Sequence, residues 1–214
     1  LSIDSLREKY KDKLTNDGKD FEKYLETINR QIKDIEKLVN EFSDFARMPK
    51  PVLKDNNLIE ILKENIDLLS EIDKSIKIDF LKNNEKIIFN CDREQIARVF
   101  FNLIKNSIES IQEKSKKNIE FIKKIKIEIL YNNDHIKFIL VDNGLGFDKI
   151  KDDIKKILNP YFTTKKNGTG LGLSIVNKII NDHNGKLDFF SVSDGAKTEI
   201  IFNLNGNRNS YSRW

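Results

Sequence analysis

The chain has 214 residues, of which 38% are hydrophobic and 34% charged, and its formal net charge is +4. This balance is typical of a folded globular protein and excludes a chain that is disordered throughout. Lysines alternate with Asp and Glu, so the sequence predicts no clustered basic surface for nucleic acid. With Cys91 alone and only His135 and His183, an internal disulfide and a zinc site of ordinary ligand spacing are excluded.

Residues 1–48 are predicted to form a helical hairpin that reverses at the polar stretch 15–18. The first helix has three-four apolar spacing at Ile3, Leu6, Tyr10 and Leu14. The second has a longer stripe, with steps of four and three, at Phe21, Leu25, Ile28, Ile32, Ile35, Val39, Phe42 and Ala46. A hairpin cannot bury such a heptad stripe alone. The stripe therefore favours pairing with a second copy in a four-helix bundle over packing against the rest of the chain.

Pro49 and Pro51 end the hairpin, because proline lacks an amide donor and restricts the residue before it. The predicted boundaries are 1–50 for the hairpin, 51–206 for a mixed domain and 207–214 for a polar tail. Helices are expected at 58–69, at 93–111 after an Asp92 cap, and at 173–183. Strands are expected at 76–80, 87–91, 124–131, 135–141, 187–192 and 198–204, with an exposed charged connection at 112–123.

Asn102 and Asn106 lie four residues apart in the helix expected after Asp92, so both amides point from one face. Neutral amide oxygens can complete the octahedral shell of Mg²⁺ that phosphates and waters otherwise supply. Taken alone, the pair is better explained as two polar residues that face solvent.

Two glycine-containing segments follow. Asp142-Asn-Gly144-Leu-Gly146 comes directly after an apolar strand, where a carboxylate can accept a hydrogen bond from adenine's amine; the alternative is an ordinary Asn-Gly turn. Gly168-Thr-Gly170-Leu-Gly172 opens a helix and offers amides and a positive dipole end to phosphate, and a flexible linker is not expected before so apolar a helix. Neither segment has the spacing of a calcium loop, a Walker A loop or a dinucleotide fingerprint.

In this order, the three segments resemble the N, G1 and G2 boxes of the histidine-kinase branch of the GHKL ATPase superfamily. The stretch 159–165 (NPYFTTK) resembles the F box, and Gly195-Ala-Lys-Thr198 resembles a degenerate G3 box that lacks its second glycine. The stretch 41–51 also resembles the end of the dimerisation hairpin in NtrY-type nitrogen-regulation sensors. The resemblance covers nearly the whole chain. It implies an α+β protein in which the helical hairpin precedes a two-layer α/β sandwich of the Bergerat type.

The resemblance implies ATP and Mg²⁺ as cofactors. Asn106 is the expected metal ligand, with Asn102 beside it near the phosphates. Asp142 is expected to bind the adenine amine, supported by Gly144, Gly146 and Thr198. A mobile lid is expected at 147–169, from which Lys165 reaches the terminal phosphates. The expected lining of the nucleotide is completed by Gly168, Gly170, Leu171 and Gly172. Asn106 and Lys165 are the implied catalytic residues, and Glu109 departs from the family in replacing a basic residue.

The implied function is the kinase core of a two-component sensor, which moves the γ-phosphate of ATP to a histidine and then to a response-regulator aspartate. The acceptor belongs in a His-Glu pair of the first hairpin helix. His135, in a strand hairpin, does not fit, and His183 reads as a cation at a helix C-terminus. We therefore expect a piece that starts downstream of the acceptor, binds Mg-ATP and does not phosphorylate itself.

The implied partners are a second copy, through residues 1–48, and an NtrX-like receiver domain. The piece itself is expected in the cytoplasm, with its parent anchored in the bacterial inner membrane. Two other classes stay open. A hydrolase of the gyrase or Hsp90 kind needs a carboxylate base where this chain has Asn102. A dimerisation module without nucleotide binding conflicts with the intact Asn106, Asp142 and glycines.

Overall fold

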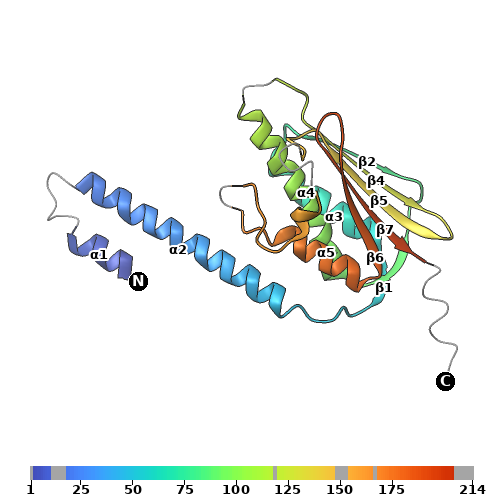
Figure 1. Cartoon of the computed structure of the whole chain (residues 1–214), viewed down its shortest axis with the longest axis horizontal. Coiled ribbons are helices and arrows are strands. Elements are labelled where there is room, and N and C mark those ends of the chain that lie inside the picture. The colour runs from blue at the N-terminus through green and yellow to red at the C-terminus, as the bar shows by residue number, and fades with distance from the viewer. Residues whose placement is uncertain (1, 11–17, 118–119, 148–153, 166–167, 205–214) are drawn as a thin grey trace. The chain divides into compact units, whose positions relative to one another are not determined.

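A computed structural model describes residues 2–10, 18–117, 120–147, 154–165 and 168–204 (Figure 1). The chain divides into two compact units. The first comprises Leu1–Met48 with Thr164–Thr169, and the second comprises Pro49–Thr163 with Gly170–Trp214. The expected positions of Leu14, most of the hairpin turn, the tail at 207–214, and lid residues 148–153 and 166–167 lie outside the described residues.

The first unit contains α1 (Ser2–Tyr10) and α2 (Gly18–Ala46). Gly18 was predicted in the turn but is the first residue of α2. The rings of Tyr10 and Phe21 meet edge to face with centroids 6.2 Å apart, and the Arg7 guanidinium lies 3.0 Å from the Glu22 carboxylate. These contacts join α1 to the start of α2 only.

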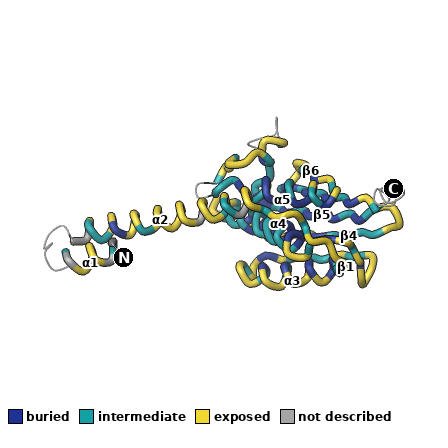
Figure 2. The backbone as a smooth tube through the Cα atoms, turned by 90° about the horizontal axis from the view of Figure 1, so that it is seen from below, coloured by how far each residue is buried: buried dark blue, intermediate teal, exposed yellow. Residues whose placement is uncertain are grey.

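Most of the apolar stripe on α2 is exposed in the described part of the first unit. Leu25 is 3% exposed, whereas the residues after it are 43–61% exposed, namely Ile28, Ile32, Ile35, Val39 and Phe42. The colouring of α2 in Figure 2 shows that residues near its start are partly buried and that most of those in its middle are exposed. Among the helices of the described ranges, none has an apolar stretch that would cross a membrane.

The second unit is built on a five-stranded sheet with the order β2-β4-β5-β7-β6. Its strands are β2 (Lys77–Lys82), β4 (Lys124–Tyr131), β5 (His135–Asp142), β6 (Gly185–Ser191) and β7 (Ala196–Asn203). The pair β2–β4 is parallel and the other pairs are antiparallel. A separate antiparallel pair joins β1 (Lys54–Asn57) to β3 (Ile88–Cys91).

Alternating side chains give the sheet one buried face and one open face. On β5, Ile136, Phe138 and Leu140 are at most 1% exposed. This face is covered by α3 (Leu58–Ser70), α4 (Arg93–Ser115) and α5 (Gly172–Asp182), which lie on the same side of the sheet in Figure 1. The rings of Phe100 and Phe138 join α4 to β5 with centroids 5.0 Å apart. The predicted two-layer α/β sandwich is confirmed, because period-two strands and amphipathic helices bury their apolar sides against each other.

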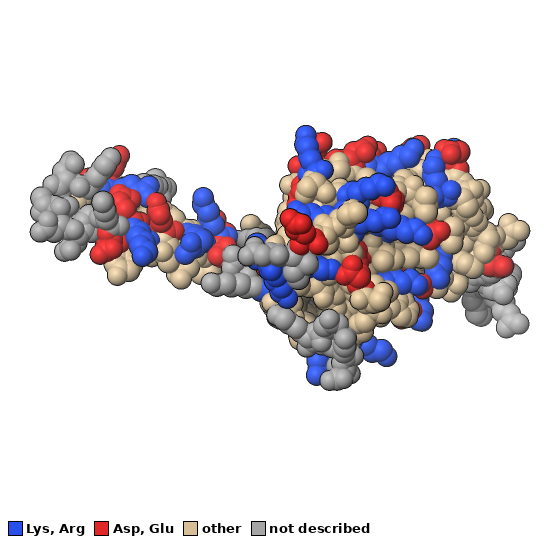
Figure 3. Space-filling view, turned by 90° about the horizontal axis from the view of Figure 1, so that it is seen from above, with Lys and Arg blue, Asp and Glu red and all other residues tan. Residues whose placement is uncertain are grey.

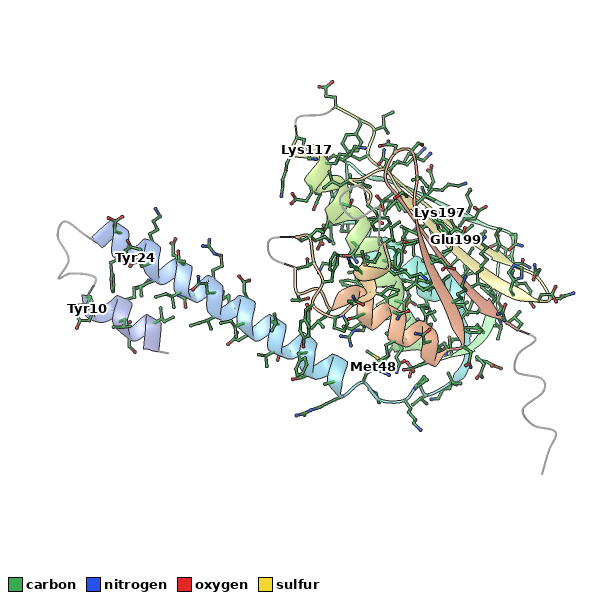
Figure 4. The ribbon with its side chains drawn as sticks, viewed as in Figure 1. Tyr10, Tyr24, Met48, Lys117, Lys197 and Glu199 are labelled. Atoms are coloured by element: carbon green, nitrogen blue, oxygen red, sulfur yellow. The ribbon has the colours of Figure 1, made fainter. Side chains whose placement is uncertain are left out.

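The open face of the sheet carries ion pairs within and between strands. Lys137 lies 3.2 Å from Glu199 on the next strand, and Lys197 pairs with the same carboxylate. Figure 4 shows Lys197 and Glu199 together on β7. Basic and acidic side chains are interspersed on the face of this unit seen in Figure 3. This arrangement is typical of a solvated surface.

The ends of β6 and β7 differ from the expected 187–192 and 198–204 by up to two residues, and two further elements differ more. β1 was not predicted, because Lys-Asp-Asn-Asn lacks apolar alternation; it is held by side-chain amides, with Asn56 donating to the Cys91 carbonyl oxygen and Asn90 donating to Asp55. The charged connection was predicted to begin at residue 112, but α4 continues to Ser115. Ile111 is fully buried on α4, and the packing of this residue carries the helix into the charged segment.

The interpretation of His183 as a cation at a helix end is wrong. The ring is 6% exposed, and its two nitrogens have different partners. Nε2 accepts a hydrogen bond from the Asp92 backbone amide at 3.0 Å, and Nδ1 lies 2.8 Å from the Ile179 carbonyl oxygen. An accepting Nε2 carries no proton, so the ring is neutral and Nδ1–H donates. His183 thereby ties the end of α5 to the residue that caps α4.

We expect replacement of His183 by Phe to lower the free energy of unfolding by about 1–3 kcal/mol, because the part-buried Asp92 amide loses its acceptor and the Ile179 carbonyl loses the ring donor while keeping the backbone amide of residue 183. Urea unfolding followed by circular dichroism measures this change. His135→Phe in the β4–β5 turn is the matched control and should stay within about 0.5 kcal/mol of the parent. Equal effects of the two substitutions would contradict a structural role for His183.

Candidate functional site

Three buried polar side chains come together between the sheet and α4. Asp142 is the last residue of β5, Ser107 lies on α4, and Thr198 lies on β7; they are 5%, 4% and 6% exposed. Thr198 is opposite Leu140 in the β5–β7 register, so it lies on the diagonal from Asp142 and on the same face of the sheet. A buried polar cluster at a strand end is a candidate binding site rather than ordinary core.

The Asp142 carboxylate accepts hydrogen bonds on both oxygens. Ser107 Oγ donates to Oδ2 at 2.9 Å, and the Gly144 amide donates to Oδ1 at 2.9 Å. Burial raises the pKa of Asp142 above the ordinary carboxyl value, although these hydrogen bonds oppose the shift. The carboxylate is therefore fixed in orientation and poorly hydrated, as expected for a group that binds a ligand donor.

Backbone segments cross behind Asp142 at a distance that only glycine permits. Gly195 has φ +106°, and a Cβ there would lie 1.9 Å from the Asp142 carbonyl oxygen. Gly146 has φ +65°, and its Cβ would lie 2.5 Å from the Gly195 carbonyl oxygen. The predicted site glycine Gly146 and the G3-like turn thus pack against each other. This contact fixes how closely the loop after β5 approaches the turn before β7.

The opposite side of the same loop rests on α4. Leu145 donates its amide hydrogen to Ser110 Oγ at 2.9 Å, and Lys114 Nζ donates to the Asn143 carbonyl oxygen at 2.8 Å. A Cβ on Gly144 would lie 2.7 Å from Ser110 Cβ, so this predicted site glycine has a steric reason. Sequence reasoning missed Ser107, Ser110 and Lys114. Asn106, Ser110 and Lys114 follow Asn102 at successive steps of four, and Ser107 precedes Ser110 by three, so helical spacing was the available signal.

Asn102 and the start of α5 form the other end of the arrangement. Asn102 Nδ2 donates to the Arg98 carbonyl oxygen at 2.9 Å, and Oδ1 would lie 3.3 Å from a Cβ on Gly172. The N-cap residue of α5 is Leu171, whose side chain makes no capping hydrogen bond, whereas α3 and α4 begin with the polar caps Asn57 and Asp92. A helix start without a polar cap leaves amides for an anionic ligand.

Asn106 precedes Ser107 on α4 and presents an amide to the same side of the helix as Asn102. The described residues contain no group of three or more His, Cys, Asp or Glu side chains that could hold a metal ion. A neutral amide oxygen with phosphate and water ligands fits Mg²⁺, which keeps several waters and rarely needs an all-protein cage. The donor set therefore fits Mg²⁺ bound together with a phosphate ligand, and does not fit a metal held by protein alone.

The remaining predicted residues lie around the lid. Gly170 has φ +71°, and its Cβ would lie 2.4 Å from the Tyr161 carbonyl carbon; Tyr161 itself has φ 68° and donates its amide hydrogen to the Gly170 carbonyl oxygen at 3.1 Å. Tyr161, within the expected lid, is thus joined by a backbone hydrogen bond to Gly170, the residue that follows the lid. Leu171 is fully buried. Lys165 and Gly168 belong to the first unit, where the Thr169 hydroxyl hydrogen-bonds to Glu41.

Asn102 and Ser107 lie five positions apart, which is about 7.5 Å along the axis of an α-helix. Ser107 meets the buried Asp142 carboxylate, and Asn102 meets the uncapped start of α5 from another side of the helix, since five positions turn it by about 140°. The first suits a donor such as an amino group, and the second suits an anion. A ligand with both groups at opposite ends, such as a nucleotide, matches the arrangement.

Comparison with known proteins gives a family match for the second unit. The sequence profile described as "Histidine kinase-, DNA gyrase B-, and HSP90-like ATPase" matches residues 91–207. A "Putative sensor histidine kinase NtrY-like" of Rickettsia conorii is 36% identical over 86% of this chain, and "Nitrogen regulation protein NtrY" of Azorhizobium caulinodans is 31% identical over 95%. The chain spans 30% and 26% of the lengths of these curated relatives.

Solved structures share the fold. The catalytic domain of histidine kinase ThkA, in a nucleotide-free form, has a TM-score of 0.61 and 29% identity, covering 71% of this chain and 95% of that one. Histidine kinase ThkA in complex with the response regulator protein TrrA has a TM-score of 0.68 and 26% identity, covering 94% of this chain and 56% of that one.

The crossing at Gly195 gives a stability prediction. We expect Gly195→Ala to lower the free energy of unfolding by more than about 2 kcal/mol, because a Cβ cannot share space with the Asp142 carbonyl and φ is in the left-handed region. Gly172→Ala is the matched control, since its Cβ meets only the Asn102 amide at 3.3 Å. Thermal unfolding of the two variants checks this. A Gly195→Ala protein as stable as the control would show that the loops do not meet as described.

Proposed function

Because this chain belongs to the family of histidine kinase-, DNA gyrase B- and HSP90-like ATPases, in its histidine kinase branch, we propose that it binds Mg-ATP as the kinase core of a two-component sensor. The observation that carries the proposal is the buried Asp142 carboxylate. It accepts hydrogen bonds from Ser107 on α4 and from the Gly144 amide in the loop after β5. A buried carboxylate with two donors already in place recognises a further donor, and the adenine amine is one.

Asp142 recognises the base by accepting a hydrogen bond from the exocyclic amine. The backbone at Gly144 and Gly146 brings the loop close enough to pack along the ring, and Thr198 lies on the neighbouring strand on the same face. The same set disfavours a base with an oxygen in place of the amine, because a carbonyl and a carboxylate are both acceptors.

The phosphates lie toward Asn102, Asn106 and the start of α5. Amides at the N-terminus of α5 bind phosphate oxygens, and Asn106 holds the magnesium ion through its amide oxygen. The ion, when bound, neutralises charge on the terminal phosphates and orients them. Lys165 and Gly168 are the lid residues proposed for the terminal phosphates. Phosphoryl transfer asks for positioning and charge neutralisation, which these groups supply.

The phosphoryl group passes from ATP to a histidine nitrogen outside the described residues. His183 is unsuited as acceptor, since both ring nitrogens are buried and engaged with Asp92 and Ile179. A phosphohistidine then passes the group to an aspartate of a response regulator. The complex of the ThkA neighbour with TrrA supports a receiver-domain partner, NtrX-like in view of the NtrY relatives.

Water is the competing acceptor, as in the hydrolases of the same family. Those enzymes need a carboxylate base at the position of Asn102. The Asn102 side chain is an amide that donates to the Arg98 carbonyl, so it cannot take a proton from water at neutral pH. Slow hydrolysis is therefore the proposed behaviour, and turnover at the rate of a dedicated ATPase would favour the hydrolase class instead.

The exposed stripe of α2 supports a homodimer through residues 1–48. Side chains such as Ile35, at 61% exposed, and Val39, at 51%, are costly to leave in water along a helix of this length. A second copy of the hairpin offers an identical stripe and buries both in a four-helix bundle.

Asp142→Asn tests the nucleotide site. We expect this variant to lose at least about tenfold in affinity for Mg-ATP, because an amide can place a donor against the adenine amine. Isothermal titration calorimetry with the full chain measures the loss. Asp188→Asn is the control, since Asp188 lies on the open face of the sheet and pairs with Lys186 at 2.7 Å. No binding by the parent chain would favour the dimerisation module, and equal binding by both variants would remove Asp142 from the site.

Ile35→Glu tests the dimer. A charge in the stripe should shift the chain to a monomer in sedimentation equilibrium at micromolar concentration, because two carboxylates would face each other in the bundle. Arg30→Glu changes charge on the opposite side of α2 and should leave the association unchanged. A monomeric parent chain, or a dimer that tolerates Ile35→Glu, would be evidence against association through this stripe.

A further inference from the structure

The hydrogen-bond partner of Ser107 is unusual for a serine inside a helix. Helical serines commonly donate back to the carbonyl oxygen four residues earlier, and Ser115 on the same helix does so, with Oγ 3.0 Å from the Ile111 carbonyl oxygen. Ser107, at 4% exposed, instead donates across to Asp142 Oδ2, a residue 35 positions away in sequence. The hydroxyl therefore serves the carboxylate rather than its own helix.

This hydrogen bond fixes what the carboxylate can offer a ligand. A serine hydroxyl has one hydrogen, and here that hydrogen is given to Asp142. The Gly144 amide occupies the other carboxylate oxygen. What remains toward a ligand is a set of lone pairs on Asp142 and on Ser107 Oγ, with no hydrogen to donate. Two acceptors side by side match the two hydrogens of an amino group.

Two further hydrogen bonds hold the loop after Asp142 against α4. Ser110 and Lys114 follow Ser107 at three and seven positions, on the same helix face, and they hold the Leu145 amide and the Asn143 carbonyl. The loop after Asp142 is therefore fastened to α4 by two contacts that do not involve Ser107. A change at Ser107 alone should leave the loop in place and alter only the carboxylate.

We propose that Ser107 is a positioning residue that makes the base pocket acceptor-only and so sets its preference for a 6-amino purine over a 6-oxo purine. This inference rests on the proposed nucleotide binding. Without the Ser107 hydroxyl, the carboxylate loses one fixed donor, can rotate, and no longer presents a defined acceptor to the amine. A 6-oxo purine has an oxygen acceptor where ATP has the amine, so it makes no hydrogen bond from its 6-position to the Asp142 carboxylate in either protein, and its affinity should change less.

The test compares ATP and ITP, which differ at the 6-position, by calorimetry with Mg²⁺ and the full chain. We expect Ser107→Ala to lower the affinity for ATP about tenfold and that for ITP less than about twofold, so the preference for ATP falls about tenfold. Ser107→Thr restores a hydroxyl and should return the preference to within about threefold of the parent. Ser115→Ala removes a hydroxyl from the same helix and should change neither affinity.

Equal losses for ATP and ITP in Ser107→Ala would assign the residue a purely structural role and overturn the inference, as would an unchanged preference or a failure of the threonine to restore it. Thermal unfolding of each variant establishes that the compared proteins are folded. If the parent chain binds neither nucleotide, the proposed function fails together with this inference. If the parent prefers ATP and Ser107→Ala keeps that preference, only the inference fails.

Discussion

The burial of one carboxylate constrains most of the second unit. An ionised Asp142 without compensation would be expensive between a sheet and a helix, so donors must reach it from its own loop and from α4. The loop that brings the Gly144 amide round must pass against Gly195, where no Cβ fits. The position of β7, the turn before it and the face of α4 are therefore linked through this single side chain. The contacts that hold Asp142 in the fold are therefore also the contacts that orient it in the proposed recognition of a base.

Helix α4 has one apolar and one polar side, because it must both pack on the sheet and supply a donor to the Asp142 carboxylate. Its apolar side packs on the sheet through residues such as Phe100, whose ring meets Phe138. Its polar side presents amides, hydroxyls and a lysine at helical spacing toward the loop after β5 and the start of α5. A rigid, well-packed helix fixes the separation between the carboxylate and the end proposed for phosphate, so the proposed nucleotide geometry follows from helix rise rather than from flexible loops.

The two units differ in how they satisfy their apolar surface. The second buries its core internally, with β5 side chains almost fully covered. The described part of the first leaves the stripe of α2 exposed beyond its contact with α1. A helix with such a stripe gains stability from tertiary or quaternary packing, and the proposed association of two hairpins would supply it.

Periodicity and local chemistry in the sequence determined the helices and strands of the second unit, the Asp92 cap, and the order of the segments from Asn102 to Gly172, because these depend on near neighbours in the chain. The polar strand β1 and the extension of α4 to Ser115 were missed, since side-chain amides and burial from distant residues overrode local pattern. The partners of Asp142 and the neutral ring of His183 were likewise decided by tertiary structure alone. Each joins residues tens of positions apart, and only the packed fold sets which donor meets which acceptor.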